Sequence, residues 1–225
     1  MRDVAATAAA TATATPTTFP ILTLDEARLA PGWGYVFDPA WLDPCESFVS
    51  MLWKFAVMNG LAGHQVVGHA ARRPVDPYEG FPATAAEVDV PGITHSLGVP
   101  PETLRVALHR PGWPRGWCSQ LRFCPRCMAR GYHSILHQYG SEPQCPLHGT
   151  WLESECAGCG AASAYHLDAR LLDAPFRCAQ CRRPYGRTAA SFVKRQPLPK
   201  RARMVLVRTF AGTGMSPPLR KAARR

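Results

Sequence analysis

Four pairs of potential metal ligands, each with the same internal spacing, constrain this chain more than any other feature. The two members of each pair are separated by two residues: Cys124 and Cys127, Cys145 and His148, Cys156 and Cys159, Cys178 and Cys181. A two-residue gap lets both side chains of a tight turn reach one cation, and two such turns complete a tetrahedron around zinc. Glycine follows two of the pairs directly, at positions 149 and 160, where a turn needs it.

The distances between the pairs indicate how they combine. The gaps between successive pairs are 17, 7 and 18 residues, and the two long gaps fall inside the range of paired Cys-x-x-Cys sites. We therefore predict two zinc ions, the first held by Cys124, Cys127, Cys145 and His148, and the second by Cys156, Cys159, Cys178 and Cys181.

Four protein ligands fill a tetrahedral ion and leave no position for water, so both sites are predicted to be structural and not catalytic. The region from about residue 118 to 187 has few large aliphatic side chains, and its own core would be marginal. Each structural zinc contributes roughly 10 to 16 kcal/mol of apparent binding energy, much of which is folding energy. Metal binding is therefore expected to replace part of the core.

Several other candidate ligands are assigned to packing. Cys45 lies in a predicted helix start and is interpreted as a small packing residue. Cys118 lies six residues before Cys124, and the alternative that it replaces a neighbouring ligand is less favoured. His133 and His137 are four residues apart and would share a helix face. No third ligand accompanies them, so packing or polar contact is preferred over a third metal site.

The N-terminal half is predicted to be helical. Asp43, Pro44 and Glu46 form a helix start with an N-cap and a capping residue, and apolar residues then recur at helical spacing until Asn59-Gly60 ends the helix. A second helix is expected over residues 61–72. The segment 93–110 predicts a short helix, a turn at Gly98-Val99 and another helix from near Pro100, the order found in a helix-turn-helix.

A basic and aromatic stretch follows. Residues 103–141 contain no acid, and arginines there alternate with aromatic side chains, which favours phosphate contact with some stacking over a solvated surface. All of the net charge of +10 lies in residues 191–225, which hold ten Lys or Arg and no acid. This Pro-containing tail is predicted to be mostly extended, and contact with a phosphate backbone or a purely solvating role both explain it. The candidate nucleic-acid contacts are Arg105, Arg110, Arg122, Arg126, Arg130, Lys200, Arg201 and Arg203.

These features predict a small mixed fold of α-helices and zinc ribbon. A disordered leader (1–30) precedes a helical, helix-turn-helix-like N-terminal domain (31–112), two tandem zinc-binding lobes (113–190) and a basic flexible tail (191–225). The leader is rich in Ala and Thr and lacks the apolar core of a secretory signal. Nothing resembles a membrane-spanning helix, and nine cysteines without a signal peptide favour a reducing compartment. We expect a cytoplasmic protein without a membrane partner.

The motifs CESFVSMLWKFAVMNGL, LRFCPRCMARGYHSILHQ and CPLHGTWLESECAGCG, followed by the last Cys pair, resemble those of the TniQ/TnsD family of transposon target-selection proteins. The resemblance covers about residues 31–187. It implies a non-enzymatic adaptor that associates with a DNA target and recruits an AAA+ ATPase, which brings in the transposase; some members are coupled to CRISPR complexes. Members generally continue beyond the zinc region, whereas here 44 residues follow Cys181, so a short member is expected.

Three other functions compete with this hypothesis. A RING finger has the same ligand order but interleaves its pairs, and by its family pattern keeps its histidine closer to the next cysteine than the seven residues between His148 and Cys156. A zinc hydrolase or nucleobase deaminase would have His-x-Glu and a later Pro-Cys-x-x-Cys, and neither is present. A stand-alone zinc ribbon that binds DNA or RNA would share the ribbon, the helix pair and the basic tail, so the sequence leaves this alternative open.

Overall fold

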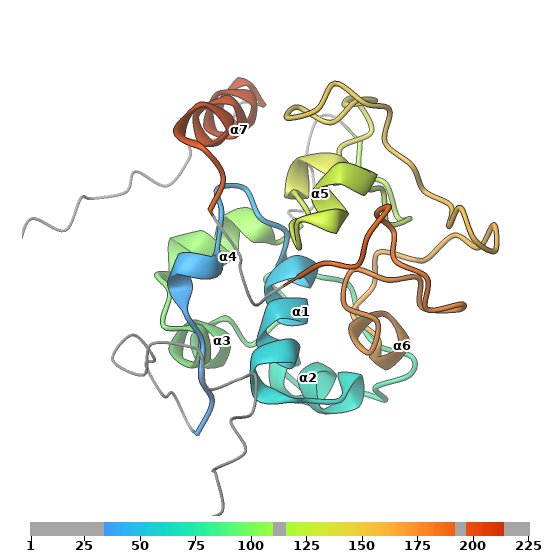
Figure 1. The fold of residues 1–225 in the computed structure, drawn as a ribbon. Helices are drawn as coiled ribbons and strands as arrows, with labels where there is room; N and C mark the ends of the chain where they lie inside the picture. The colour runs from blue at the N-terminus through green and yellow to red at the C-terminus, as the bar shows by residue number, and fades with distance from the viewer. Residues whose placement is uncertain (1–33, 110–115, 192–196, 214–225) are drawn as a thin grey trace, which may run out of the picture.

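The computed structural model describes residues 34–109, 116–191 and 197–213, and Figure 1 shows their arrangement. The predicted leader and Arg110 lie outside these ranges. Within them, β-structure is confined to isolated bridges, and no helix is long and apolar enough to cross a membrane. The helical elements are η3 (Pro39–Trp41), α1 (Phe48–Asn59), α2 (Gly63–Ala70), α3 (Val90–Leu97), α4 (Pro101–Ala107), α5 (Pro125–Ala129), η4 (Ile135–Gln138), α6 (Ala169–Leu172) and α7 (Lys200–Gly212).

Helix α1 ends where the sequence predicts but begins later. Gly60 adopts a left-handed conformation with φ 61° and closes the helix. The N-cap is Ser47, whose hydroxyl accepts a hydrogen bond from the amide three residues later, so the predicted start at Asp43 is wrong. Cys45 has φ 57°, which breaks the helical path. Glu46 does reach back to the Asp43 amide at 3.0 Å, but this bond closes a turn in front of the helix.

The following helices agree with the sequence in order and differ in their ends. Helix α2 is shorter than the predicted span of 61–72. Helix α3 starts at Val90, because Asp89 caps it and Pro91 fits into its first turn. Gly98 then turns the chain with φ 59° into α4. The helices α3 and α4 are therefore present, while their use as a DNA-binding helix-turn-helix stays a prediction.

One hydrophobic core, which we call the first core, joins the helical half to the half that contains the candidate metal ligands. It combines side chains of α1 to α4 with Leu121, Phe123, Phe176 and the ligands Cys156 and Cys178. The Trp53 indole of α1 donates to the Leu171 carbonyl of α6 at 2.8 Å. Helices α1, α2 and α6 accordingly pack in the lower half of Figure 1. The predicted ranges 31–112 and 113–190 thus share their interior.

Helices α2 and α6 approach each other closely at Gly63. A Cβ atom added to Gly63 would lie 2.2 Å from the Ala169 carbonyl oxygen and 2.9 Å from the Asp173 side chain. Real Cβ atoms do not come so near to a backbone oxygen, so only glycine allows this contact. The first residue of α2 is therefore fixed by packing and not by helix propensity.

A second core holds the C-terminal helix. It combines Leu206 and Phe210 of α7 with Leu198, with Ile135 and Leu136, and with the ligands Cys124, Cys127 and Cys145. The tail is therefore not extended throughout, since residues 200–212 are helical and packed. The turn at residues 43–46 holds this segment in place: Leu198 donates its amide to the Asp43 carboxylate at 3.0 Å, and the Cys45 thiol donates to the Leu206 carbonyl at 3.6 Å.

A buried polar network lies beside this turn. The side chains of Glu46 and Lys54 form an ion pair with 0% exposure of both, and Ser50 donates to the same carboxylate at 2.6 Å. His133 bonds the Ser47 hydroxyl through Nδ1 and the Arg122 carbonyl through Nε2, each at 2.7 Å. These bonds connect the start of α1 to the segment between the first two ligand pairs. The network fixes how the helical half meets the first set of ligands.

Candidate metal centres

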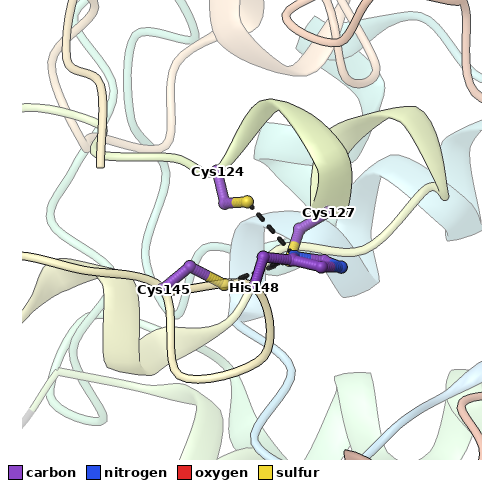
Figure 2. Close-up of side chains that lie close together, drawn as sticks. All are labelled: Cys124, Cys127, Cys145 and His148. Atoms are coloured by element: carbon purple, nitrogen blue, oxygen red, sulfur yellow. Dashed lines mark hydrogen bonds between the residues drawn. The ribbon is translucent and has the colours of Figure 1, made fainter. Parts of the chain in front are cut away.

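The first predicted ligand set comes together in space. Cys124 is the N-cap of α5 and Cys127 lies inside that helix, while Cys145 and His148 come from the turn that faces it. Figure 2 shows the four side chains converging on one point. The three sulfurs are buried and the histidine is half-buried. We call this set the first metal cluster.

The distances within the first metal cluster fit a tetrahedral ion. Nδ1 of His148 lies 3.3 Å from the sulfurs of Cys124 and Cys127 and 3.6 Å from that of Cys145. The sulfurs of Cys127 and Cys145 are 3.6 Å apart. A tetrahedron with metal–sulfur bonds of about 2.3 Å has edges of about 3.8 Å between sulfurs and about 3.6 Å between sulfur and nitrogen. The described edges are close to these lengths and far longer than a disulfide bond, which is about 2.05 Å.

The second predicted set forms a similar cluster, which we call the second metal cluster. The Cys156 and Cys181 sulfurs are 3.6 Å apart, and those of Cys159 and Cys178 are 3.7 Å apart. All four sulfurs lie within 4.8 Å of one another. Cys156 and Cys178 are buried in the first core, whereas Cys159 and Cys181 are exposed. The second metal cluster is therefore more open to solvent than the first.

Both clusters combine neighbouring pairs. The first pair joins the second, and the third joins the fourth, as the gap lengths predict. The cross-brace of a RING finger needs the first pair to join the third, and these clusters do not have that arrangement. Two metal ions can therefore be held, one in each cluster.

Short turns bracketed by β-bridges position three of the four pairs. The bridges are Gln144–Trp151, Glu155–Ala162 and Arg177–Pro184. In the first two turns, Gly149 and Gly160 have φ of 61° and 73°, and each donates its amide to the first cysteine's carbonyl at 2.8 Å. In the third, Arg182 occupies the same position with φ 62°. Its guanidinium donates to the Asp173 carbonyl at 2.7 Å, which ties this strained turn to the end of α6.

Two contacts to ligand sulfurs were not predicted from the sequence. The Thr150 hydroxyl lies 3.3 Å from the Cys124 sulfur, and the Gly158 amide donates to the Cys156 sulfur at 3.3 Å. Hydrogen bonds of this kind disperse the charge of thiolate ligands and orient them. Thr150 lies two residues after His148, and Gly158 lies two residues after Cys156. This spacing from a candidate ligand is the sequence signal that would have found both residues.

Protons are unevenly shared among the thiols of each cluster. Hydrogen bonds from Cys127 and Cys145 lower the pKa of the Cys124 thiol, whereas hydrogen bonds to Cys124 and Cys145, together with burial, raise the pKa of Cys127. A backbone hydrogen bond from Arg183 lowers the pKa of Cys181 to about 7. A divalent ion held by either cluster would take the place of these protons, because only thiolates bind it, and its binding would therefore be coupled to proton release.

The remaining candidate ligands lie outside both clusters. Burial raises the pKa of the Cys45 thiol to about 12, so this thiol acts as a packing group that also bonds α7. Cys118 is half-buried, and its amide donates to the Gln138 carbonyl at 2.9 Å. The expected polar contact is confirmed for His133. His137 is buried against it, with ring centroids 5.1 Å apart.

The predicted nucleic-acid contacts are divided between surface and interior. Arg122 is half-buried, and its guanidinium donates to the carbonyls of Tyr139 and Glu142 at 2.7 Å each. In the described structure it therefore fixes the backbone of residues 139–142 to the segment before the first ligand pair. Arg105 is exposed and pairs with Glu102 at 3.3 Å. Four other predicted contacts are exposed: Arg126, Arg130, Lys200 and Arg201. Arg203 is half-buried, and Arg208, which was not among the predicted contacts, is exposed.

Comparison with known proteins adds no assignment. No family model matches the chain, and a search of curated proteins finds no match in sequence.

Proposed function

We propose that this chain is a zinc-stabilised, non-enzymatic adaptor that associates with DNA and serves target-site selection in DNA transposition. In this function it recruits an AAA+ ATPase and, through it, the transposase; a CRISPR effector complex is a further candidate partner. The observation that carries the proposal is the closed geometry of both metal clusters. Each offers four ligands around one point, with ligand sulfurs built into the hydrophobic cores.

Zinc is the ion that these ligands fit best. Three thiolates with one imidazole, and four thiolates, are the usual ligand sets of structural zinc. The edge lengths near 3.6 Å agree with its tetrahedral coordination, and soft sulfur ligands disfavour magnesium and calcium. Zinc bound in this way would link turns that are far apart in the sequence, and it would supply folding energy to both lobes.

A scaffold of this kind acts through its surface. Arg126 and Arg130 are exposed on and beside α5, within the acid-free stretch that spans the first pair. The C-terminal helix adds further exposed cations. Such surfaces favour an anionic polymer, because each cation that meets a phosphate releases counterions. The ATPase and the transposition context rest on the resemblance of residues 121–160 to TniQ/TnsD motifs.

Two measurements test the proposal. The zinc-loaded chain should bind a DNA duplex with an affinity that falls steeply as salt increases, which fluorescence anisotropy measures. It should also co-purify with an AAA+ transposition ATPase. Salt-sensitive DNA binding without any ATPase binding would favour the stand-alone zinc-ribbon alternative. If the folded, zinc-loaded chain binds neither DNA nor ATPase, the proposal is wrong.

A further inference from the structure

We propose that α7 is the helix with which this protein contacts double-stranded DNA, and that α4, the second helix of the predicted helix-turn-helix, is not. This inference rests on the proposed association with DNA and names the surface responsible. It depends on three features of α7: one side is buried and the other exposed, the helix is anchored to the rest of the fold, and its exposed side is positively charged.

Helix α7 has one buried side and one exposed side. Leu206 and Phe210 are 0% and 1% exposed and face the second core. At 3.6 residues per turn, Arg201 and Arg208 lie on the opposite side and Lys200 lies at its flank, and all three are exposed. Arg203 lies at the flank beside Phe210 and is half-buried. The exposed side therefore differs from the predicted contact set, since it includes Arg208 and leaves Arg203 at its edge.

The helix is anchored and does not move as a free tail. Its entry is held by the bond from the Leu198 amide to Asp43, and its middle by the bond from Cys45 to the Leu206 carbonyl. Figure 1 shows α7 at the top of the molecule, and its buried residues share the second core with Val106 of α4 and with the cysteines of the first metal cluster. A fixed helix pays less conformational entropy when it binds than an extended arm would. Its cations are therefore preorganised.

The charge of this face is unopposed within its own segment. Residues 191–213 contain no Asp or Glu. On α4, by contrast, the cation Arg105 is paired with Glu102, and both side chains are more than half exposed. An acid on the presented face of a helix repels phosphate. Between the two helices, α7 is the better match for an anionic partner.

Duplex DNA is the anionic partner that fits best. An α-helix with its side chains is about 10 to 12 Å in diameter, which fits the major-groove width of about 12 Å. Met204 and Val205 lie between the cations and are 45% and 41% exposed, so apolar side chains would face the base edges. The A-form major groove of RNA is too narrow for a helix. A helix that lies on a membrane buries a continuous apolar face in the lipid, whereas the exposed side of α7 carries Arg201 and Arg208, and its larger apolar residues Leu206 and Phe210 face the second core.

The test compares charge removal on the two helices in the full, zinc-loaded chain. Anisotropy with a DNA duplex, over about 50 to 200 mM salt, gives the slope of log affinity against log salt. We expect the double variant Arg201→Gln/Arg208→Gln to lower the magnitude of this slope by about 1.8, or 0.9 for each lost phosphate contact. The matched control Arg105→Gln should leave it unchanged. Circular dichroism and zinc content establish that each variant is folded.

A second variant tests insertion into the groove. Met204→Ala should weaken DNA binding without changing the salt slope, because it removes an apolar contact and no charge. The inference is overturned if the wild type binds DNA but the α7 variants bind like it, or if Arg105→Gln has the larger effect; the proposed function then survives. It is also overturned if α7 binds phosphatidylserine vesicles and not the duplex. A wild type that binds no DNA at any salt refutes the proposed association with DNA, on which this inference rests, and if the ATPase does not bind either, the proposed function is wrong as a whole.

Discussion

Lys54 offers a sharp test of the buried polar network, because its removal leaves a carboxylate without a cation inside the protein. Its ammonium pairs with Glu46 and also donates to the Trp41 carbonyl at 2.9 Å. Glu46 keeps two further donors, the Ser50 hydroxyl at 2.6 Å and the Asp43 amide at 3.0 Å. Lys54→Met retains much of the apolar stem and removes only the charged end.

The expected cost is large for a single substitution. Removing one member of a buried ion pair destabilises by about 3 to 5 kcal/mol, because the remaining charge loses its counterion. At about 2 to 4 °C per kcal/mol for a chain of this size, the melting temperature should fall by roughly 6 to 20 °C. The two remaining hydrogen bonds to Glu46 favour the lower part of this range.

Urea unfolding in excess zinc measures the effect, with zinc content checked before the titration. The double variant Glu46→Gln/Lys54→Met is the matched control, since its amide keeps hydrogen-bonding capacity without charge. We expect it to recover most of the lost stability. A loss below about 1 kcal/mol for Lys54→Met, or a double variant no more stable than the single one, would refute the argument that charge burial is the cause.

Further predictions concern the metal clusters, the packing of α2 and a buried histidine. Cys156→Ser should lose one zinc ion and the fold of its lobe, and elemental analysis that still finds two zinc ions would contradict this. In the wild type, a chelator should remove zinc from the second metal cluster before the first, because two of the sulfurs of the second cluster are exposed. A colorimetric zinc indicator should then record release in two phases, and release in a single phase would contradict this prediction. Gly63→Ala should lower the free energy of unfolding by about 1 to 3 kcal/mol or more, since the new methyl group meets the Ala169 carbonyl. In the control Gly68→Ala, in the same helix, the methyl group meets nothing within 4 Å, and the variant should be more stable by up to about 1 kcal/mol. Equal melting temperatures for the two variants would count against the packing described. Burial lowers the pKa of His133 to about 4 from 6.5, so its neutral form stabilises the fold above pH 6.5 and this contribution, about 3 kcal/mol, is lost as the pH falls towards 4; unfolding at saturating zinc between pH 5 and 7 should show a weaker pH dependence in His133→Gln.

The two clusters of candidate metal ligands were predictable because their information is local. A pair such as Cys156 and Cys159 needs only a turn, and the turn needs only a residue that accepts positive φ, such as Gly160. The gap lengths then predicted which pairs combine. The third turn uses Arg182 in that conformation, and nothing local marks it. Its stabilisation comes from a bond to the Asp173 carbonyl, which only the fold supplies.

The errors have a common physical cause. Asp43 and Pro44 have the composition of a helix start, but Asp43 is used to bind Leu198, which lies 155 positions later. The C-terminal segment was interpreted by its charge and prolines, although Leu206 and Phe210 are spaced as one face of a helix. That face is stabilised by the second core, whose composition the sequence alone did not reveal. In both places a distant contact outweighed the local preference.

The turn at residues 43–46 also sets a time order for assembly. Its partners lie far along the chain: Tyr132 bonds Pro44 from 88 positions away, and Leu206 bonds Cys45 from 161. A ribosome adding about 5 to 20 residues per second needs roughly 10 to 30 s to make that longer interval. Contacts at such separation also slow the folding of a finished chain. The turn before α1 is therefore synthesised early, but its contacts with the α7 segment form late. Until α7 emerges, the nascent protein exposes the apolar surface of the second core that α7 will cover.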